Sequence, residues 1–193
     1  MGRKRVIDRD HILDAAERVI GRDGAVNLTL DSVALEAGVS KGSVVYDHKT
    51  KHALIGAIVQ RALARDNAFN TACADDLGDV DSRVVRGRIK AAANPLPTEQ
   101  RAIALSLCAA LAQDAGLREA MQHNQSSVIN ALLDDAAVPR GALLAYLALE
   151  GLKLLESLDF HVFPAKERSR LLREIDWLVD LDPAPKPSRR KAR

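Results

Sequence analysis

Aromatic residues are scarce in this sequence. Phe, Trp and Tyr together make up 3% of the 193 residues, while alanine and leucine are abundant. Sandwiches and barrels are enriched in β-branched and aromatic residues, whereas alanine and leucine are among the strongest helix formers. The composition therefore predicts an all-α fold.

Cysteine is also rare, and the residue sets that carry catalysis are missing. Cys73 and Cys108 lie far apart without a Cys-x-x-Cys spacing, which argues against a disulfide framework and against a zinc site. The five histidines are scattered, and no Ser-His-Asp, Cys-His or Glu-x-x-His spacing occurs. We expect a protein that is not an enzyme and that uses no metal and no cofactor.

Long apolar runs are absent as well. The longest uncharged one is "AIALSLCAALA", residues 102–112, well below the ~18 residues that span a membrane. The opening "MGRKRVIDRD" is basic but has no apolar segment of the kind that secretion signals contain. These features predict a cytoplasmic protein without a membrane partner.

Charge is unevenly distributed along the chain. The net charge is +2, yet the tail "PAPKPSRRKAR", residues 183–193, holds five basic residues and no acidic one. A second basic cluster, Arg3, Lys4 and Arg5, lies near the start. Attraction to a polyanion would therefore come from local clusters. The Pro-rich tail is expected to be disordered, and its role stays open between DNA binding, RNA binding and solubility.

Capping residues and apolar periodicity divide the chain into helices. Thr29, Ser40, Thr50 and Thr98 are suitable N-caps, and Pro139 and Pro164 suit first turns. Residues 75–81 read as a loop, and "NPLP" at 94–97 as a break. The expected helices cover residues 10–23, 30–37, 41–48, 51–74, 82–93, 98–113, 116–136, 139–159 and 164–181.

Residues 29–48 fit the helix-turn-helix pattern. Ala34 is small where the two helices cross, and Gly38 occupies the turn that requires a positive φ. Val33, Ala37, Val39 and Val44 supply the apolar contacts between the helices. Spacing alone leaves open an ordinary αα-corner of a helical enzyme.

The stretch "ILDAAERVIGRDGAVNLTLDSVALEAGVSKGSVVYDHKTKHALIGAIV" resembles the tetracycline-repressor (TetR) family of bacterial transcriptional regulators. The positions that carry the resemblance are Gly24, Thr29, Val33-Ala34, Ala37 to Gly42, Tyr46 and Lys51. The resemblance implies an N-terminal three-helix helix-turn-helix DNA-binding domain with its arm, residues 1–53. A helical effector-binding and dimerisation domain would follow at 54–182, and the basic tail at 183–193.

The same resemblance implies a set of DNA contacts. Hydroxyls and an ammonium at the start of the recognition helix suit phosphates and base edges in a major groove. Tyr46 could instead pack in the core, and Lys51 could be simply solvated. The arm could enter a minor groove or remain idle. The candidate DNA-binding residues are Thr29, Ser40, Lys41, Ser43, Val44, Tyr46, Asp47, His48, Lys51, Arg3, Lys4 and Arg5.

The sequence departs from its relatives at Asp47, His48 and His52. A similar variant of the family motif reads "GGLLYHFPSKEAL", against "GSVVYDHKTKHAL" here. Asp47 either accepts a bond from cytosine N4 or is a solvated or helix-pairing acid. His48 is expected to pack where relatives have Phe. A metal site at these three residues is disfavoured because Thr50 interrupts the helix that would align the histidines.

Two further sets follow from the resemblance. The last two helices are too apolar to be covered within one subunit, so a homodimer is expected through Leu147, Gly151, Leu154, Leu155, Leu158, Leu172, Ile175 and Leu178, some of which belong to the intrachain core. An effector pocket is expected from Leu105, Cys108, Leu111, Met121, Gln125 and Val128, although a Cys such as Cys108 is more often a small buried hydrophobe than a ligand contact.

The implied function is a DNA-binding transcriptional regulator, a repressor that binds a palindromic operator as a homodimer and is released by an unidentified small-molecule effector. The alternative is a protein of the same fold that binds other partners and has weakened or no sequence-specific DNA binding. Asp47 and the modest charge of the module keep that alternative open.

Overall fold

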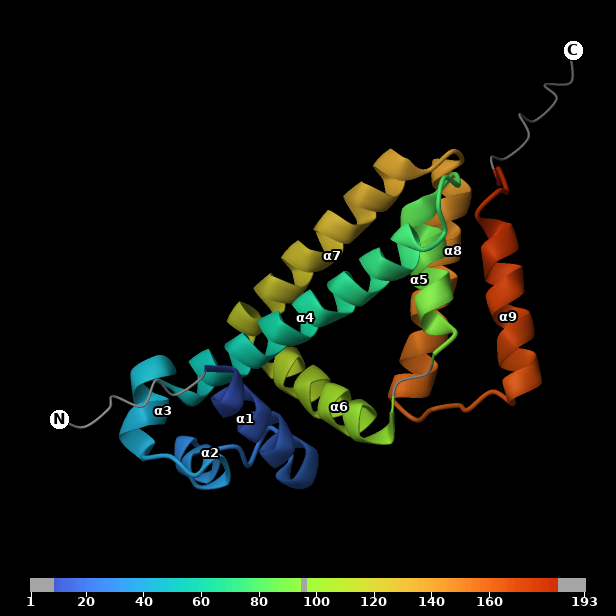
Figure 1. Ribbon diagram of the computed structural model, residues 1–193. Helices are drawn as coiled ribbons and strands as arrows, with labels where there is room; N and C mark the ends of the chain where they lie inside the picture. The colour runs from blue at the N-terminus through green and yellow to red at the C-terminus, as the bar shows by residue number, and fades with distance from the viewer. Residues whose placement is uncertain (1–8, 95–96, 184–193) are drawn as a thin grey trace, which may run out of the picture. The chain divides into compact units, whose positions relative to one another are not determined.

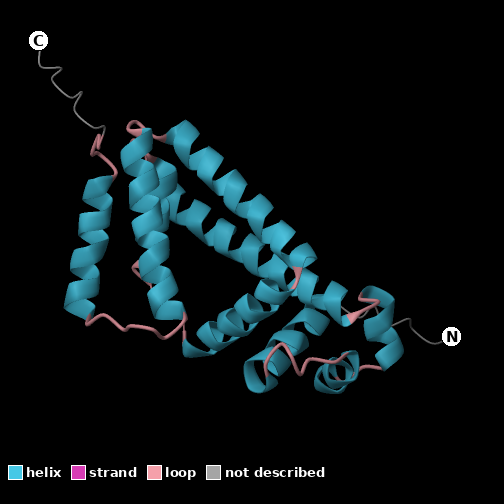
Figure 2. Cartoon of the chain, turned by 180° about the vertical axis from the view of Figure 1, so that it is seen from behind, coloured by secondary structure: helices cyan, strands magenta, loops and turns pink. Residues whose placement is uncertain are grey.

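A computed structural model describes residues 9–94 and 97–183, and all of their regular structure is helical (Figures 1 and 2). The predicted all-α fold is therefore confirmed. Arg3, Lys4, Arg5 and the tail beyond Pro183 lie outside the described residues. The helices are α1 (Arg9–Asp23), α2 (Leu30–Ala37), α3 (Lys41–Asp47), α4 (Lys51–Asp75), α5 (Arg83–Ala92), α6 (Thr98–Gln113), α7 (Ala115–Asp135), α8 (Pro139–Ser157) and α9 (Ala165–Leu178).

Contacts divide the described residues into two compact units. The residues up to Asn67 and those from Pro97 to Gln125 form the first unit, and the others form the second. In the first unit, buried side chains of α1, α2 and α3 share one core with Ile58 of α4 and with Leu107, Leu111 and Leu117 of α6 and α7. The three N-terminal helices therefore bury their apolar faces together with residues of α4, α6 and α7.

Local signals in the sequence set the ends of α2. Thr29 Oγ1 accepts a hydrogen bond from the Ser32 amide at 3.0 Å, and the Ser32 hydroxyl accepts one from the Thr29 amide at 3.1 Å. This reciprocal cap satisfies two amide groups that would otherwise lack partners. At the other end, Gly38 has φ +65°, a left-handed conformation that favours glycine. The predicted cap and turn are both confirmed.

Polar caps also begin the next two helices. The Ser40 hydroxyl accepts from the Ser43 amide at 3.1 Å, and the Thr50 hydroxyl from the Ala53 amide at 3.0 Å. The same prediction was wrong for Thr98, which is the first residue of α6; Pro97 holds the cap position without a side-chain bond. A rigid φ at Pro97 replaces the expected hydroxyl cap.

Ion pairs join α1 to α4 within the first unit. Arg61 of α4 donates from Nη1 to Oδ1 of Asp14 at 2.7 Å and from Nε to Oε1 of Glu17 at 3.2 Å. Its side chain is largely covered, while both carboxylates keep partial contact with water. These bonds hold α1 against α4.

The second unit has its own core, formed by α5, α7, α8 and α9. Leu149 of α8 and Val179, just after α9, are fully buried in it. The start of α8 passes close to the end of α9. A Cβ added at Gly141 would lie 2.3 Å from the Leu181 carbonyl oxygen and 2.7 Å from that of Leu178. Only glycine allows this approach.

Gly141→Ala is therefore expected to destabilise the protein by about 1–3 kcal/mol, the usual cost of inserting a methyl into a filled site. Urea unfolding followed by circular dichroism measures the change. Gly56→Ala is the matched control, because its Cβ would meet the Leu117 side chain at an ordinary 3.6 Å. That variant is expected to gain up to about 1 kcal/mol from helix propensity. Equal stability of Gly141→Ala and the wild type would contradict the close approach.

Candidate nucleic-acid interface

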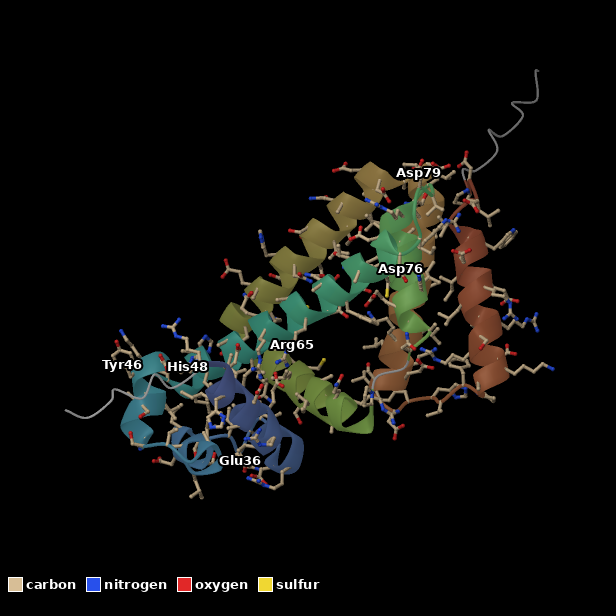
Figure 3. All side chains as sticks on the ribbon, in the orientation of Figure 1. Glu36, Tyr46, His48, Arg65, Asp76 and Asp79 are labelled. Carbon is tan, nitrogen blue, oxygen red and sulfur yellow. The ribbon has the colours of Figure 1, made fainter. Side chains whose placement is uncertain are left out.

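The recognition helix α3 has one buried face and one exposed face. Val44 is 0% exposed and packs with Val33, Ala37 and Leu54 in the first core. Tyr46 is 85% exposed and projects from α3 into solvent (Figure 3). Tyr46 is therefore not a core residue, and its ring and hydroxyl are available to a partner.

Hydroxyl and ammonium groups gather around the start of α3. The hydroxyls of Ser40 and Ser43 lie 2.8 Å apart. Lys41 is exposed, and its Nζ donates to Asp31 of α2 at 2.8 Å. A phosphate would compete with Asp31 for this ammonium. The expected polar groups therefore meet on one surface of α2 and α3.

Lys51 and Thr29 flank that surface. Lys51, the first residue of α4, donates its ammonium to the backbone carbonyl of Val26 between α1 and α2. This bond fixes where the positive charge lies. Thr29 is exposed, but its oxygen already caps α2, so it has less capacity left for a phosphate.

The structure corrects two of the expected side-chain contacts with DNA. Val44 is fully buried, so its side chain cannot reach DNA in this conformation. Asp47 does not point freely toward a base: its side chain is 10% exposed, and its carboxylate accepts from Arg9 Nε at 3.4 Å. In this conformation Asp47 of α3 is paired with a residue of α1.

His48 is buried at the junction of α3 and α4 (Figure 3), as expected from its place in the motif. Its amide donates to the Val44 carbonyl at 2.8 Å and ends α3. The ring atom Nε2 is buried and has no hydrogen-bond partner among the described residues. The side chain therefore contributes packing, and a direct base contact by His48 is not supported.

Burial lowers the pKa of the His48 imidazole below its ordinary value, Asp47 acts in the opposite direction, and Arg9 lowers it further. The unfolded chain, with a histidine pKa of about 6.5, then binds a proton more readily than the folded protein. Stability should fall as pH drops below about 6.5 and should stop falling below the folded pKa.

His48→Phe should remove this loss of stability. We expect the free energy of unfolding of the wild type to fall more between pH 7.5 and 5.5 than that of the variant. Urea titrations at both pH values measure the difference. His161→Phe, a change at an exposed histidine, serves as the control. Identical pH dependence in His48→Phe and the wild type would refute the assignment.

The expected effector residues lie in different surroundings. Leu111 and Met121 pack in or against the first core, whereas Val128 belongs to the second. Leu105 and Cys108 of α6 are exposed, which disagrees with Cys108 as a buried hydrophobe. Gln125 contacts Met121 one turn earlier on α7.

A hollow of about 520 Å³ occurs in the second unit, lined by Asp79, Val80, Asp81, Arg86 and Asp180. Arg86 is paired there with Asp176 and Asp180, both at 2.7 Å. Four of the five lining residues are charged, which differs from the apolar lining expected for an effector site. None of the expected effector residues lines it.

The expected dimer residues separate into two groups. Leu147 and Leu154 of α8 are 55% and 53% exposed, Leu155 and Gly151 are also exposed, and Leu158 is half-buried. Leu172 and Ile175 of α9 are buried in the second core, so they are not available as surface in the single chain, and Leu178 is half-buried against that core. Trp177 of α9, which the sequence reasoning missed, is 62% exposed.

Two further findings concern residues 9–94 and 97–183. Their His, Cys, Asp and Glu side chains do not gather in any group of three suited to a metal ion. Of the helices in the same residues, none has the length and apolar character needed to cross a membrane.

Two family sequence models match the chain. The model of bacterial regulatory proteins of the tetR family matches residues 12–58, and that of the tetracyclin repressor-like C-terminal domain matches residues 82–180. The chain belongs to the TetR family. It is thus a transcriptional regulator by family, with a helix-turn-helix and a helical C-terminal domain. The sequence matches none of the curated proteins.

Solved structures resemble this TetR-family chain along most of its length. The multidrug binding protein EbrR, complexed with malachite green, is 25% identical, with a TM-score of 0.67 over 93% of this chain and all of its own. A TetR-family member from Streptomyces coelicolor A3 is 25% identical, with a TM-score of 0.64 over 86% of this chain and 96% of its own. A Rhodococcus sp. protein assigned to the family is 22% identical, with a TM-score of 0.70 over 89% of this chain and 98% of its own.

Proposed function

We propose that this TetR-family protein binds a palindromic operator in duplex DNA as a homodimer and represses transcription in the cytoplasm. The supporting observation is the division of α3 into two faces. Val44 locks the helix onto the first core, while Tyr46 and Lys41 stay on the surface with the hydroxyls of Ser40 and Ser43. This arrangement suits a helix that lies in a major groove and contacts phosphates on either side.

The apolar surface of α8 supports the dimer. Leu147, Gly151 and Leu154 follow at helical spacing and lie on one exposed stripe, with Leu155 beside it. A side chain with half its surface in water gains free energy when a second copy covers it. One helix-turn-helix reads few base pairs, so two copies about one helical turn apart on DNA give the selectivity that a regulator requires.

A small-molecule effector would release the protein from DNA. EbrR has been crystallised with malachite green and with ethidium, and a Saccharomonospora viridis regulator with choline. We propose a small organic effector for this chain, with Leu105, Cys108, Leu111, Met121 and Gln125 of the first unit as the candidate contacts. Such an effector would bind better to a dimer whose two recognition helices are spaced wrongly for the operator. Its binding would raise the population of that dimer and so lower the affinity for the operator.

Two single substitutions test the DNA-contact surface. Lys51→Ala should lower affinity for DNA of any sequence and reduce the salt slope by about one phosphate contact. Tyr46→Phe should weaken binding severalfold if its hydroxyl donates to a phosphate. Fluorescence anisotropy with labelled DNA from upstream of the gene measures both. Wild-type affinity in both variants would favour the alternative, an interaction protein of the TetR fold without sequence-specific DNA binding.

A further inference from the structure

An ion pair connects the start of α1 to the end of the recognition helix. Arg9, the first residue of α1, donates its Nε–H to Oδ1 of Asp47, the last residue of α3, at 3.4 Å. The two residues are 38 positions apart in the sequence. The pair therefore forms only when α1 and α3 are packed in the first unit.

The two partners differ strongly in exposure. The Asp47 side chain is 10% exposed, while that of Arg9 is 78% exposed. Asp47 is a covered acid that needs a cation nearby, since an unpaired charge is costly away from water. Arg9 has donated only its Nε–H to Asp47 among the described residues. The Arg9 side chain stays largely in contact with water, and its two Nη atoms carry four further N–H donors.

The carboxylate that Arg9 binds belongs to the residue that follows Tyr46 on the surface proposed to meet DNA. Tyr46, the residue before Asp47, is 85% exposed. His48, the residue after it, is buried, so the end of α3 is fixed on the first core. A guanidinium held by a fixed carboxylate presents its outer N–H groups in one direction, which suits bidentate contact with a phosphate.

We propose that Arg9 binds a DNA phosphate next to the recognition helix and that Asp47 is the positioning residue that holds Arg9 for this contact. The inference rests on the proposed function, because it requires DNA to lie against α3. It assigns Asp47 a favourable part in DNA binding, although an acid at this place would by itself repel phosphate.

Asp47→Asn distinguishes the two effects by sign. If Asp47 acts only through its charge, removing that charge lowers repulsion and tightens DNA binding. If Asp47 positions Arg9, the neutral amide in Asp47→Asn cannot form the charge-assisted bond to the guanidinium. Arg9 is then less ordered before DNA binds, so ordering it on binding costs more free energy. We expect Asp47→Asn to weaken binding about threefold to tenfold at 150 mM salt, the range for one misplaced charged contact.

The experiment measures affinity for upstream DNA and for random DNA over 50–300 mM salt by anisotropy. Arg9→Gln should weaken binding to both DNAs and reduce the salt slope by about one contact. The double variant Arg9→Gln/Asp47→Asn should bind no more weakly than Arg9→Gln, since Asp47 acts through Arg9. Arg18→Gln is the matched control: it removes the same charge from α1, where Arg18 pairs with Glu36 at 2.8 Å. It should leave the slope unchanged.

Thermal unfolding of each variant shows whether the first unit stays folded. If Asp47→Asn destabilises α3, Arg9→Gln still tests the contact between Arg9 and the DNA phosphate, because Arg9 is exposed. Tighter or unchanged binding by Asp47→Asn would overturn the inference. So would an equal loss from Asp47→Asn in the wild-type and Arg9→Gln backgrounds. If the wild type binds upstream and random DNA with equal affinity, that result contradicts the proposed function, and the inference, which rests on that function, is contradicted as well.

Discussion

Replacing Leu154 by arginine is expected to convert the protein from a dimer to a monomer and to lower its operator affinity by at least about a hundredfold. Leu154 lies on the exposed stripe of α8 with Leu147 and Gly151. A two-fold interface brings the same stripe of both copies together, so each dimer would bury two new charges in apolar surroundings. Loss of the second recognition helix removes the roughly 10²–10⁴-fold gain of bivalent binding.

Analytical ultracentrifugation measures the oligomeric state of Leu154→Arg, and anisotropy with full operator and half-operator DNA measures its affinity. The variant should bind the two DNAs with similar affinity, whereas the wild type should prefer the full operator. Phe69→Arg is the control, because Phe69 of α4 is also half-exposed and the change adds the same charge. A Leu154→Arg protein that stays dimeric would show that the interface lies elsewhere.

Ile58→Ala should destabilise the protein by about 2–5 kcal/mol, the range for large-to-small substitutions in a filled core. Ile58 of α4 is 0% exposed and belongs to the core that α1, α2 and α3 share with α6 and α7. The cavity would therefore loosen the support of the recognition helix as well as α4. Because Tyr46 and Lys51 depend on that support, DNA affinity should fall with the population of folded protein.

Urea unfolding at constant pH measures the loss. Ile58→Val keeps most of the side chain and should cost about 0.5–1.5 kcal/mol. Leu105→Ala, at a half-exposed position outside the buried core, should lie within about 0.5 kcal/mol of the wild type. If Ile58→Ala cost no more than Ile58→Val, the shared core would not have the tight packing assigned to it.

The sequence predicted the helix-turn-helix in detail because its determinants are local. Thr29 and Ser40 bond to amides three residues away, and Gly38 supplies a positive φ within one turn. Each of these interactions lies inside a window of four residues. Propensity, capping and apolar spacing therefore all indicated the same elements.

The surroundings of Asp47 could not be predicted in the same way. Its partner, Arg9, is 38 residues away, and the pair depends on how α1 packs against α3. The sequence did carry a signal, an acid where the similar family motif has His, but it did not identify the cation that compensates for it. Arg9 was absent from the expected DNA-contact residues for this reason.

Apolar spacing likewise could not separate the core from an interface between copies. On α9, Leu172 and Ile175 belong to the intrachain core, while on α8, Leu154 with the same kind of spacing is exposed. Helical periodicity shows which residues share a face and leaves open what covers that face. Trp177 was missed because Arg173, Glu174, Asp176 and Asp180 hold charged positions close to it in the sequence.

The most direct test of the account is whether the intact protein distinguishes its own upstream DNA from random DNA of equal length and composition. We expect a complex with an inverted repeat in that DNA, at least about a thousandfold tighter than with random DNA at 150 mM salt, with two chains bound per repeat. Competition anisotropy measures the ratio, and footprinting identifies the repeat. Equal affinity for both DNAs at low and at physiological salt would contradict a sequence-specific regulator.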